Sequence, residues 1–461
     1  MTKVVVLGGG PAGYVAALRA AQLGAAVTLV EAHDVGGTCV NRGCIPTKSL
    51  VASVERLRHA RGSAAFGVVA GDVRVDFSVM MARKAEATAT LRAGVERLLK
   101  GREVEVVRGR GRLLDARTIA VAESAGAERE VTGDALILAT GSEPLRLPAF
   151  DFSDPRVMTS DELLEVDHVP DSLVVVGGGV IGCEFAAVFA ELGSKVTVVE
   201  MLEQLLPGEG RRAGAALLQS FTKKGIDVRV KTRVDDVVSS GDDGLRLLLS
   251  DGQEVGGELV LVSVGRRPVS SAAGFEEVGV TVDEAGFVIV DEALRTAVGG
   301  VFAAGDVAGP PLLAHWAYYE GALAAQNAVD DGHLAVDRRV VPNCVFTHPE
   351  VASFGVSEEE ARAKGMDVVV AQVRFGANSK AVVEGETDGF VRIVTTRGEE
   401  RILGASLVGP RVTELVHELA LAASAGLPLR DIADTIHAHP TLSEAVAETA
   451  FVGLGRGLHV L

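Results

Sequence analysis

The sequence predicts an α/β protein with two doubly wound parallel-sheet domains, which resemble Rossmann domains, and an α+β domain at the carboxyl end. Two observations predict the doubly wound part: a glycine-rich turn follows a short apolar strand near the start of the chain, and the same pattern recurs at residues 174–200. A third observation predicts the last domain, because short strands and helices alternate beyond residue 341 without another such turn. The strands are expected near residues 343–347, 367–374, 390–395 and 402–408, and the helices near residues 357–364, 411–425 and 442–454. With 461 residues, the chain is long enough for about three domains.

The first glycine-rich turn is part of a complete strand–turn–helix–strand unit. A strand at residues 4–7 leads into Gly8, Gly10 and Gly13, and a helical pattern then connects to a second strand that ends in Glu31. In such a unit the first glycine makes the turn, the second admits a pyrophosphate, and the third lets the helix pack on the strand. The amino end of the helix offers free N–H groups to the phosphates. We expect Glu31 to accept hydrogen bonds from a ribose hydroxyl, so the unit predicts a dinucleotide site.

The second unit repeats the first at a constant offset of 169 residues. Segments 8–31 and 177–200 are identical at twelve of twenty-four aligned positions. The glycines of the repeat are Gly177, Gly179 and Gly182. Two complete units predict two dinucleotides, and the alternative is a duplicate that has lost binding. The repeat ends in Glu200, which would repel a 2′-phosphate, and no arginine stands in the next ten positions. NAD is therefore favoured over NADP.

Between the two units lies a pair of cysteines, Cys39 and Cys44, set among glycines at residues 36–48. A helix is expected from Thr47 onward, and Asp76 is expected to cap a long helix that ends near Gly101. A structural disulfide is disfavoured, because so short a loop restrains the unfolded chain little. A zinc site would need a second pair of ligands at the right spacing, whereas Cys183 and Cys344 each stand alone. The pattern therefore favours a redox-active pair, and we predict no metal site.

The segment GGTCVNRGCIPTK closely resembles the active-site signature of the flavoprotein disulfide reductases, and the resemblance extends over essentially the whole chain. It implies FAD at the first unit and NAD at the second. It assigns Asp306 to the ribityl chain of FAD, although a plain turn aspartate is the alternative. Further cofactor contacts are expected from Thr38, Thr140 and Gly141 (FAD) and from Gly265 (NAD). The expected domains are residues 1–148 (FAD-binding, first part), 149–268 (NAD-binding), 269–340 (FAD-binding, second part) and 341–461 (dimerisation).

The resemblance also implies roles in catalysis. Cys39 would attack the substrate, and Cys44 would be the thiolate that lies against the flavin. Lys48 would sit near the flavin ring with Glu184 as its partner.

Thiol exchange also needs a base, and no histidine adjoins the cysteines. The resemblance assigns this role to His439, supported by Glu444, acting on the disulfide of the other subunit of a homodimer. Without the resemblance, His439 would be interpreted as a packed or surface histidine, which remains the interpretation of His437.

Within the family, the chain is most similar to the dihydrolipoamide dehydrogenases. Glutathione reductases usually have arginines for NADP and a tyrosine where this chain has Val180, and mercuric reductases usually add a carboxyl-terminal cysteine pair. The resemblance implies oxidation of protein-bound dihydrolipoyl groups by NAD⁺, with the acyltransferase component of a 2-oxo acid dehydrogenase complex as partner. A helix is expected from His315 to about Val329, and one of its positions departs from the pattern, because Trp316 follows His315 where a lysine is usual. The alternatives are an NADH-dependent reductase of another disulfide or a quinone, and a non-catalytic flavin-binding redox sensor or interaction module.

Composition excludes other classes of function. The formal net charge of −17 and an aromatic content of 4% disfavour nucleic acid as a partner. No apolar run approaches the ~20 residues of a membrane span. The first glycine turn begins at Gly8, which leaves no room for a leader before it. Four cysteines, two of them in one motif, fit a reducing compartment, so we expect a cytoplasmic protein.

Overall fold

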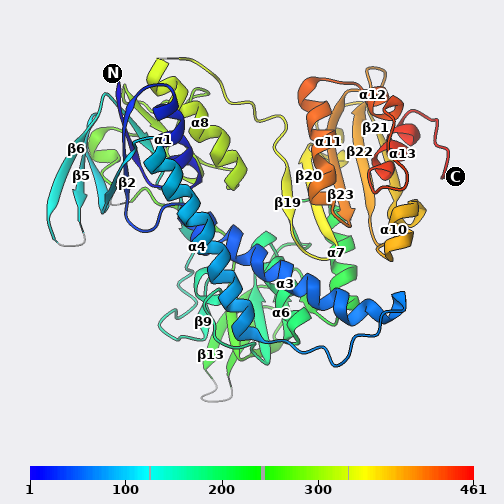
Figure 1. Ribbon diagram of the computed structural model, residues 1–461. Helices are drawn as coiled ribbons and strands as arrows, with labels where there is room; N and C mark the ends of the chain where they lie inside the picture. The colour runs from blue at the N-terminus through cyan, green and yellow to red at the C-terminus, as the bar shows by residue number, and fades with distance from the viewer. Residues whose placement is uncertain (124–125, 240–243, 272, 331, 461) are drawn as a thin grey trace.

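The computed structural model describes residues 1–123, 126–239, 244–271, 273–330 and 332–460. The chain forms three parts (Figure 1): an amino-terminal part at the upper left, a second part at the bottom, and a carboxyl-terminal part at the upper right. The two ends of the chain lie on opposite sides of the molecule. The α/β fold class is confirmed.

The amino-terminal part is built on a five-stranded parallel sheet with the order β18-β7-β1-β2-β3. Its strands are β1 (Lys3–Leu7), β2 (Ala26–Glu31), β3 (Glu105–Arg108), β7 (Ala135–Leu138) and β18 (Val301–Ala303). Helices α1 (Pro11–Gln22) and α8 (Ala314–Asp330) pack together on one face. An antiparallel sheet of β4 (Arg110–Asp115), β5 (Thr118–Ala122) and β6 (Glu128–Thr132) shares a core with the other face. Cover on both faces explains why residues 4–7 are continuously apolar.

The second part repeats this plan in a sheet with the order β12-β11-β10-β16-β9. Its strands are β9 (Val157–Met158), β10 (Ser172–Val176), β11 (Lys195–Val199), β12 (Asp227–Arg229) and β16 (Leu259–Val262). Val5 pairs with Thr28 in the first sheet, and Val174 pairs with Thr197 in the second, so the 169-residue offset holds in the strand register. Helices α5 (Ser160–Leu163), α6 (Val180–Leu192) and α7 (Arg211–Lys223) belong here, with a second sheet of β13 (Val234–Ser239), β14 (Leu245–Leu249) and β15 (Glu254–Gly257).

Three helices and a short ribbon join the first two parts. The ribbon pairs β8 (Ser142–Pro144) with β17 (Arg266–Pro268). The helices are α2 (Gly37–Arg42), α3 (Cys44–Gly62) and α4 (Phe77–Gly101), and α3 shares a core with α6. Asp76 caps α4 by accepting a hydrogen bond from the Val79 N–H (3.1 Å), as the sequence predicted. The 3₁₀ turns among the described residues include η1 (Ser63–Phe66), η3 (Glu276–Val278), η4 (Asp306–Ala308) and η5 (Phe375–Ala377).

The carboxyl-terminal part is an antiparallel sheet with the order β19-β20-β23-β22-β21. Its strands are β19 (Asn343–Val345), β20 (Glu350–Gly355), β21 (Val368–Arg374), β22 (Phe390–Thr396) and β23 (Ile402–Gly409). Its helices are α9 (Glu358–Ala363), α10 (Ser379–Glu384), α11 (Val412–Ala425), α12 (Leu429–Asp434) and α13 (Glu444–Gly453). The sequence predicted four of these strands and three of these helices, but missed β20, α10 and α12. The two missed helices have six residues each, too few to show a helical period.

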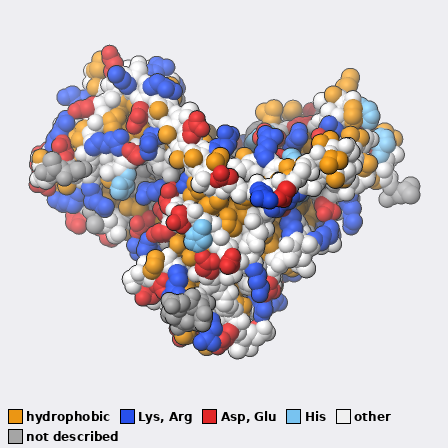
Figure 2. All heavy atoms as spheres, turned by 60° about the horizontal axis from the view of Figure 1, so that its bottom comes forward, with side chains coloured by type: hydrophobic (Ala, Val, Ile, Leu, Met, Phe, Trp, Pro, Cys, Tyr) orange, Lys and Arg blue, Asp and Glu red, His pale blue; other side chains and the backbone are white. Residues whose placement is uncertain are grey.

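No helix within the described ranges is long and apolar enough to span a lipid bilayer. Figure 2 shows one face of the molecule, on which acidic and basic side chains are interspersed.

Candidate active site

The two glycine-rich turns have the same backbone geometry. Gly8 (φ +101°) and Gly177 (φ +108°) adopt a conformation that favours glycine. A Cβ atom on Gly13 would lie 1.7 Å from the Gly8 carbonyl oxygen, and one on Gly182 would lie 2.0 Å from the Gly177 carbonyl oxygen. Only glycine therefore lets α1 and α6 pack this closely against their turns.

The middle glycines face open space instead. Gly10 and Gly179 cap the amino ends of α1 and α6. A Cβ atom on Gly179 would meet no described heavy atom within 4 Å, and one on Gly10 would come no closer than 3.8 Å, to the Gly37 Cα. Each helix thus presents its N–H groups to a cradle that a side chain would fill, which fits the pyrophosphate of a dinucleotide.

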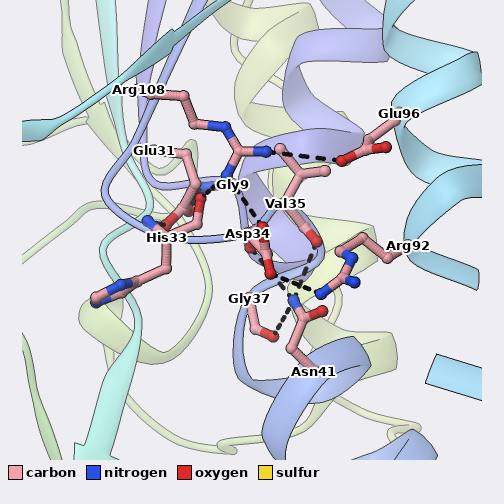
Figure 3. Close-up of polar contacts among 10 residues, drawn as sticks. All are labelled: Gly9, Glu31, His33, Asp34, Val35, Gly37, Asn41, Arg92, Glu96 and Arg108. Carbon is pink, nitrogen blue, oxygen red and sulfur yellow. Dashed lines mark hydrogen bonds and ion pairs between the residues drawn. The ribbon is translucent and has the colours of Figure 1, made fainter. Parts of the chain in front are cut away.

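The acidic residue at the end of each second strand is fixed by two backbone N–H groups. Glu31 accepts hydrogen bonds from the N–H groups of Gly9 (2.6 Å) and His33 (2.7 Å), as Figure 3 shows. Glu200 does the same with the N–H groups of Gly178 (2.6 Å) and Leu202 (2.6 Å). Both carboxylates line the cavity described below and keep lone pairs for ribose hydroxyls.

The segment that follows Glu31 is held against α2 by a polar network (Figure 3). The Asn41 amide nitrogen donates to the carbonyl oxygens of Asp34 (3.2 Å), Val35 (3.0 Å) and Gly37 (3.1 Å). The Asp34 carboxylate in turn accepts from Arg92 at 2.6 Å. These contacts fix the start of α2, and with it Cys39, relative to the first glycine turn.

Cys39 lies in α2, and Cys44 is the first residue of α3; both are free thiols. The helix was expected from Thr47 onward and begins three residues earlier, so Cys44 stands at its positive amino end. The hydrogen bond from the Cys39 thiol, aided by the Lys48 charge, lowers the pKa of Cys44 to about 7 although burial opposes it. The same hydrogen bond raises the pKa of Cys39. Of the two thiols, Cys44 therefore loses its proton more readily.

Lys48 and Glu184 form an ion pair beside the cysteines. Their closest nitrogen–oxygen distance is 2.7 Å, and the Glu184 side chain is only 3% exposed. Glu184 also accepts a hydrogen bond from the Phe346 N–H at 2.9 Å, and the Lys48 ammonium lies 4.7 Å from the centre of the Phe346 ring. Three parts of the chain therefore meet at this pair.

A single cavity of about 2380 Å³ connects both glycine turns with the cysteines, well above the ~300–1,000 Å³ of one ordinary ligand pocket. Most of the site residues predicted from the sequence line it: Gly8, Gly10, Glu31, Thr38, Cys39, Cys44, Lys48, Thr140, Gly141, Gly177, Gly179, Glu184, Glu200, Gly265 and Asp306. Gly13 and Gly182 are not among its lining residues, because they pack helix against turn.

His439 and Glu444 also lie outside the lining of this cavity. They form their own pair, with 2.8 Å between the His439 Nδ1 and a Glu444 oxygen. The Thr441 N–H donates to the other Glu444 oxygen at 2.7 Å. The His439 side chain is 69% exposed. His437 instead pairs with Glu418 at 2.8 Å and is 8% exposed, which agrees with its interpretation as a packed histidine.

Asp306 is held by two residues that the sequence interpretation missed. It accepts a hydrogen bond from the Ser142 hydroxyl at 2.5 Å, and that hydroxyl accepts from Arg266 at 2.7 Å. Ser142 and Arg266 each directly follow a glycine predicted to contact a cofactor, and this was the available signal.

Tyr318 is a further missed residue. Its hydroxyl lies 4.0 Å from the Cys39 sulfur, and it lines the cavity. Tyr318 stands three residues after His315 in the predicted helix, so helical spacing could have placed the two on one face.

Comparison with known proteins agrees with this geometry. Residues 2–332 match the family described as pyridine nucleotide-disulphide oxidoreductase, and residues 341–450 match its dimerisation domain. The chain is 41% identical to a dihydrolipoyl dehydrogenase of Geobacillus stearothermophilus, over 100% of this chain and 98% of the relative. It is 42% identical to dihydrolipoyl dehydrogenase 2 of Haloarcula marismortui, over 99% of this chain and 98% of the relative.

Solved structures with the same fold include LpdA from Mycobacterium tuberculosis, with a TM-score of 0.92, 32% identity, and coverage of 98% of this chain and 99% of that chain. The flavoprotein disulfide reductase RclA from Escherichia coli, in its Cu(II) complex, has a TM-score of 0.89 and 28% identity, covering 98% of this chain and 99% of that chain.

Proposed function

The chain belongs to the pyridine nucleotide-disulphide oxidoreductase family, and from this premise we propose that it is an NAD-dependent dihydrolipoyl dehydrogenase. In this proposal, protein-bound dihydrolipoyl groups are oxidised through Cys39, Cys44 and FAD, and NAD⁺ is reduced. The observation that carries the proposal is the thiol pair in one cavity between two dinucleotide turns. Relatives named dihydrolipoyl dehydrogenase, 38–42% identical over nearly the full chain, support the choice of substrate.

The residues of the cavity suit both cofactors. FAD would be held by Gly8, Gly10, Glu31, Thr38, Thr140, Gly141 and Asp306, and NAD by Gly177, Gly179, Glu200 and Gly265. When bound, FAD supplies the capacity to take two electrons from the thiols and deliver them as a hydride to NAD⁺. We assign residues 1–148 and 269–340 to the FAD-binding domain, 149–268 to the NAD-binding domain, and 341–461 to the dimerisation domain, whose last residue lies outside the described residues.

Each side chain of the site has a separate role in the proposed thiol–disulfide exchange. Cys39 takes the attack of the substrate sulfur, because Cys44 is the thiolate that leaves and is stabilised by Lys48 and the helix end. Glu184 fixes the Lys48 ammonium beside Cys44. The substrate thiol must lose its proton to a base, and we assign that role to His439, whose tautomer Glu444 fixes.

We assign the base to the opposite subunit of a homodimer. The match of residues 341–450 to a dimerisation domain supports a homodimer. Exposed His439 lies outside the cavity of its own chain, which supports a role in the other subunit. Mixing inactive Cys44→Ala and His439→Ala proteins under subunit exchange should restore one active site in each hybrid dimer. Hybrids verified by mass but without activity would show that each chain supplies its own base.

The acyltransferase component of a 2-oxo acid dehydrogenase complex would present the dihydrolipoyl group, and the cytoplasm is the expected compartment, in keeping with bacterial and archaeal relatives. One observation favours a second candidate, an NADH-dependent reductase of another disulfide or a quinone. The usual lysine is replaced by Trp316, which is 3% exposed and has Arg338 5.0 Å from its ring centre.

Steady-state assays with free dihydrolipoamide and either NAD⁺ or NADP⁺ test the proposal. Rapid reduction of NAD⁺ supports it. Turnover only with NADH and a quinone or another disulfide would favour the second candidate. A non-catalytic flavin-binding sensor would show neither activity.

A further inference from the structure

One of the three tyrosines of the chain contacts the reactive cysteine pair. Tyr318 extends from α8, and its hydroxyl oxygen lies 4.0 Å from the Cys39 sulfur, within reach of a hydrogen bond to sulfur. We propose that Tyr318 is a catalytic residue that donates a hydrogen bond to the Cys39 sulfur when this sulfur leaves as a thiolate. The inference rests on the proposed thiol exchange and adds a residue to it.

Tyr318 is suited to be a donor because it keeps its proton. Burial, and then the nearby Cys39, raise the pKa of the Tyr318 hydroxyl. A neutral phenol can donate to a thiolate, and a thiolate can only accept. The Tyr14 ring, from α1, packs edge-on against the Tyr318 ring, with 5.9 Å between the ring centres. The phenol is therefore held in place on the cavity wall beside Cys39.

The exchange has one step in which Cys39 must carry charge. In the first step a substrate thiolate attacks Cys39 of the Cys39–Cys44 disulfide; the new sulfur–sulfur bond forms, the old one breaks, and the electron pair leaves on Cys44. In the second step the other substrate thiolate attacks the first substrate sulfur, the bond to Cys39 breaks, and the electron pair leaves on Cys39. The substrate is then a disulfide, oxidised by two electrons, and the cysteine pair is reduced by two. Tyr318 donates its hydrogen bond in this second step, when Cys39 leaves as a thiolate.

The charged and titratable groups around Cys39 show why Tyr318 is the residue that stabilises the Cys39 thiolate. They are Tyr14 on α1, Cys44 and Lys48 on α3, and Tyr318 on α8. The hydrogen bond to Cys44, and then burial, raise the pKa of Cys39, whereas Tyr318 and, less strongly, Lys48 lower it. The Lys48 ammonium is bound to Glu184 at 2.7 Å, so the tyrosine hydroxyl is the group in direct contact that favours the Cys39 thiolate.

The test measures the alkylation of Cys39 by iodoacetamide across pH. Holoenzyme reduced with one equivalent of dithionite is compared with Tyr318→Phe and with Tyr319→Phe as the matched control. Tyr319 is the next residue of α8, is 40% exposed, and accepts a hydrogen bond from the Asp337 N–H, away from the thiols. Trypsin cuts after Arg42, between the two cysteines, so mass spectrometry quantifies Cys39 and Cys44 on separate peptides.

We expect Tyr318→Phe to move the pH midpoint of Cys39 alkylation upward and to slow alkylation below the midpoint about tenfold, the effect of one hydrogen bond to a charged group. Tyr319→Phe should follow the wild type. A Tyr318→Phe profile that superimposes on the wild type, or an equal shift in Tyr319→Phe, would overturn the inference. Because the assay contains no dithiol substrate and no NAD⁺, a failure to oxidise dihydrolipoamide would count against the proposed function alone.

Discussion

The two members of the Lys48–Glu184 ion pair should shift the pKa of Cys44 in opposite directions. Lys48 lowers the pKa of Cys44 and Glu184 raises it, after the larger contribution of the Cys39 hydrogen bond. Lys48→Met should therefore raise this pKa, and Glu184→Gln, which keeps the shape of the side chain, should lower it. The carboxyl is nearly fully buried, so water screens its charge little.

The magnitude follows from the surroundings of Cys44. The pKa is lowered from 9.0 to about 7, and the Cys39 thiol is the main cause. Burial opposes this and also outranks Lys48. A neighbouring opposite charge typically shifts a pKa by ~1–3, and we expect the lower end of that range for Lys48. A rise of one unit reduces the thiolate fraction about tenfold at pH values below the midpoint. Lys48→Arg retains the charge and should stay close to the wild type.

The assay follows the long-wavelength charge-transfer absorbance of two-electron-reduced holoenzyme as a function of pH. If Cys44 is the thiolate that lies against the flavin, as proposed, the band requires that thiolate and should disappear as pH falls through the pKa of Cys44. The pH midpoint of the band should be higher in Lys48→Met and lower in Glu184→Gln than in the wild type. In the double variant it should lie closer to the wild-type value. Shifts of the same sign in both single variants would refute the reasoning.

Three further predictions concern the cofactors and the cysteines. The wild type should prefer NAD⁺ over NADP⁺ by at least tenfold, or ~1.4 kcal/mol, and Glu200→Gln should narrow this preference in steady-state assays. Gly10→Ala should leave the melting temperature of the apoprotein unchanged but reduce its FAD content, because its Cβ atom would enter the open cradle, whereas Gly182→Ala should lower the melting temperature through a 2.0 Å contact. Cys44→Ser should retain FAD but lose the charge-transfer band on reduction.

Each of these has a result that would contradict it. Equal efficiency with NADP⁺ in the wild type would remove the assigned role of Glu200. Full FAD content in Gly10→Ala would mean that the first glycine turn does not hold the pyrophosphate. A band that persists in Cys44→Ser would reverse the roles of the two cysteines.

The glycine turns were predictable from sequence because their constraints are local. The Cβ contacts that exclude side chains at Gly13 and Gly182 involve carbonyl oxygens only five residues away. The repeat of the whole unit at one offset made the second site as visible as the first. The same locality made the cap of α4 predictable from Asp76.

Contacts between distant segments were not visible in spacing or periodicity. Lys48 and Glu184 are 136 residues apart, and only the family resemblance suggested that they pair. The contact of Tyr318 with Cys39 spans 279 residues and depends on how α8 packs beside α1. The start of α3 at Cys44, three residues before the expected start at Thr47, was also missed; Pro46 lies in the first turn, where proline is tolerated. β20 ends at Gly355 and contains Glu350 and Ser353, so it lacks a continuous apolar pattern.

The most direct test of electron transfer through the cysteine pair is an anaerobic titration of oxidised holoenzyme with dihydrolipoamide, without NAD⁺. Thiols are trapped by alkylation and counted by mass on the peptides that contain Cys39 and Cys44. We predict that each molecule of dithiol consumed, up to one per FAD, yields one molecule of lipoamide disulfide and makes both cysteines available for alkylation. Oxidation of the dithiol without any alkylation of Cys39 and Cys44 would contradict electron transfer through the cysteine pair.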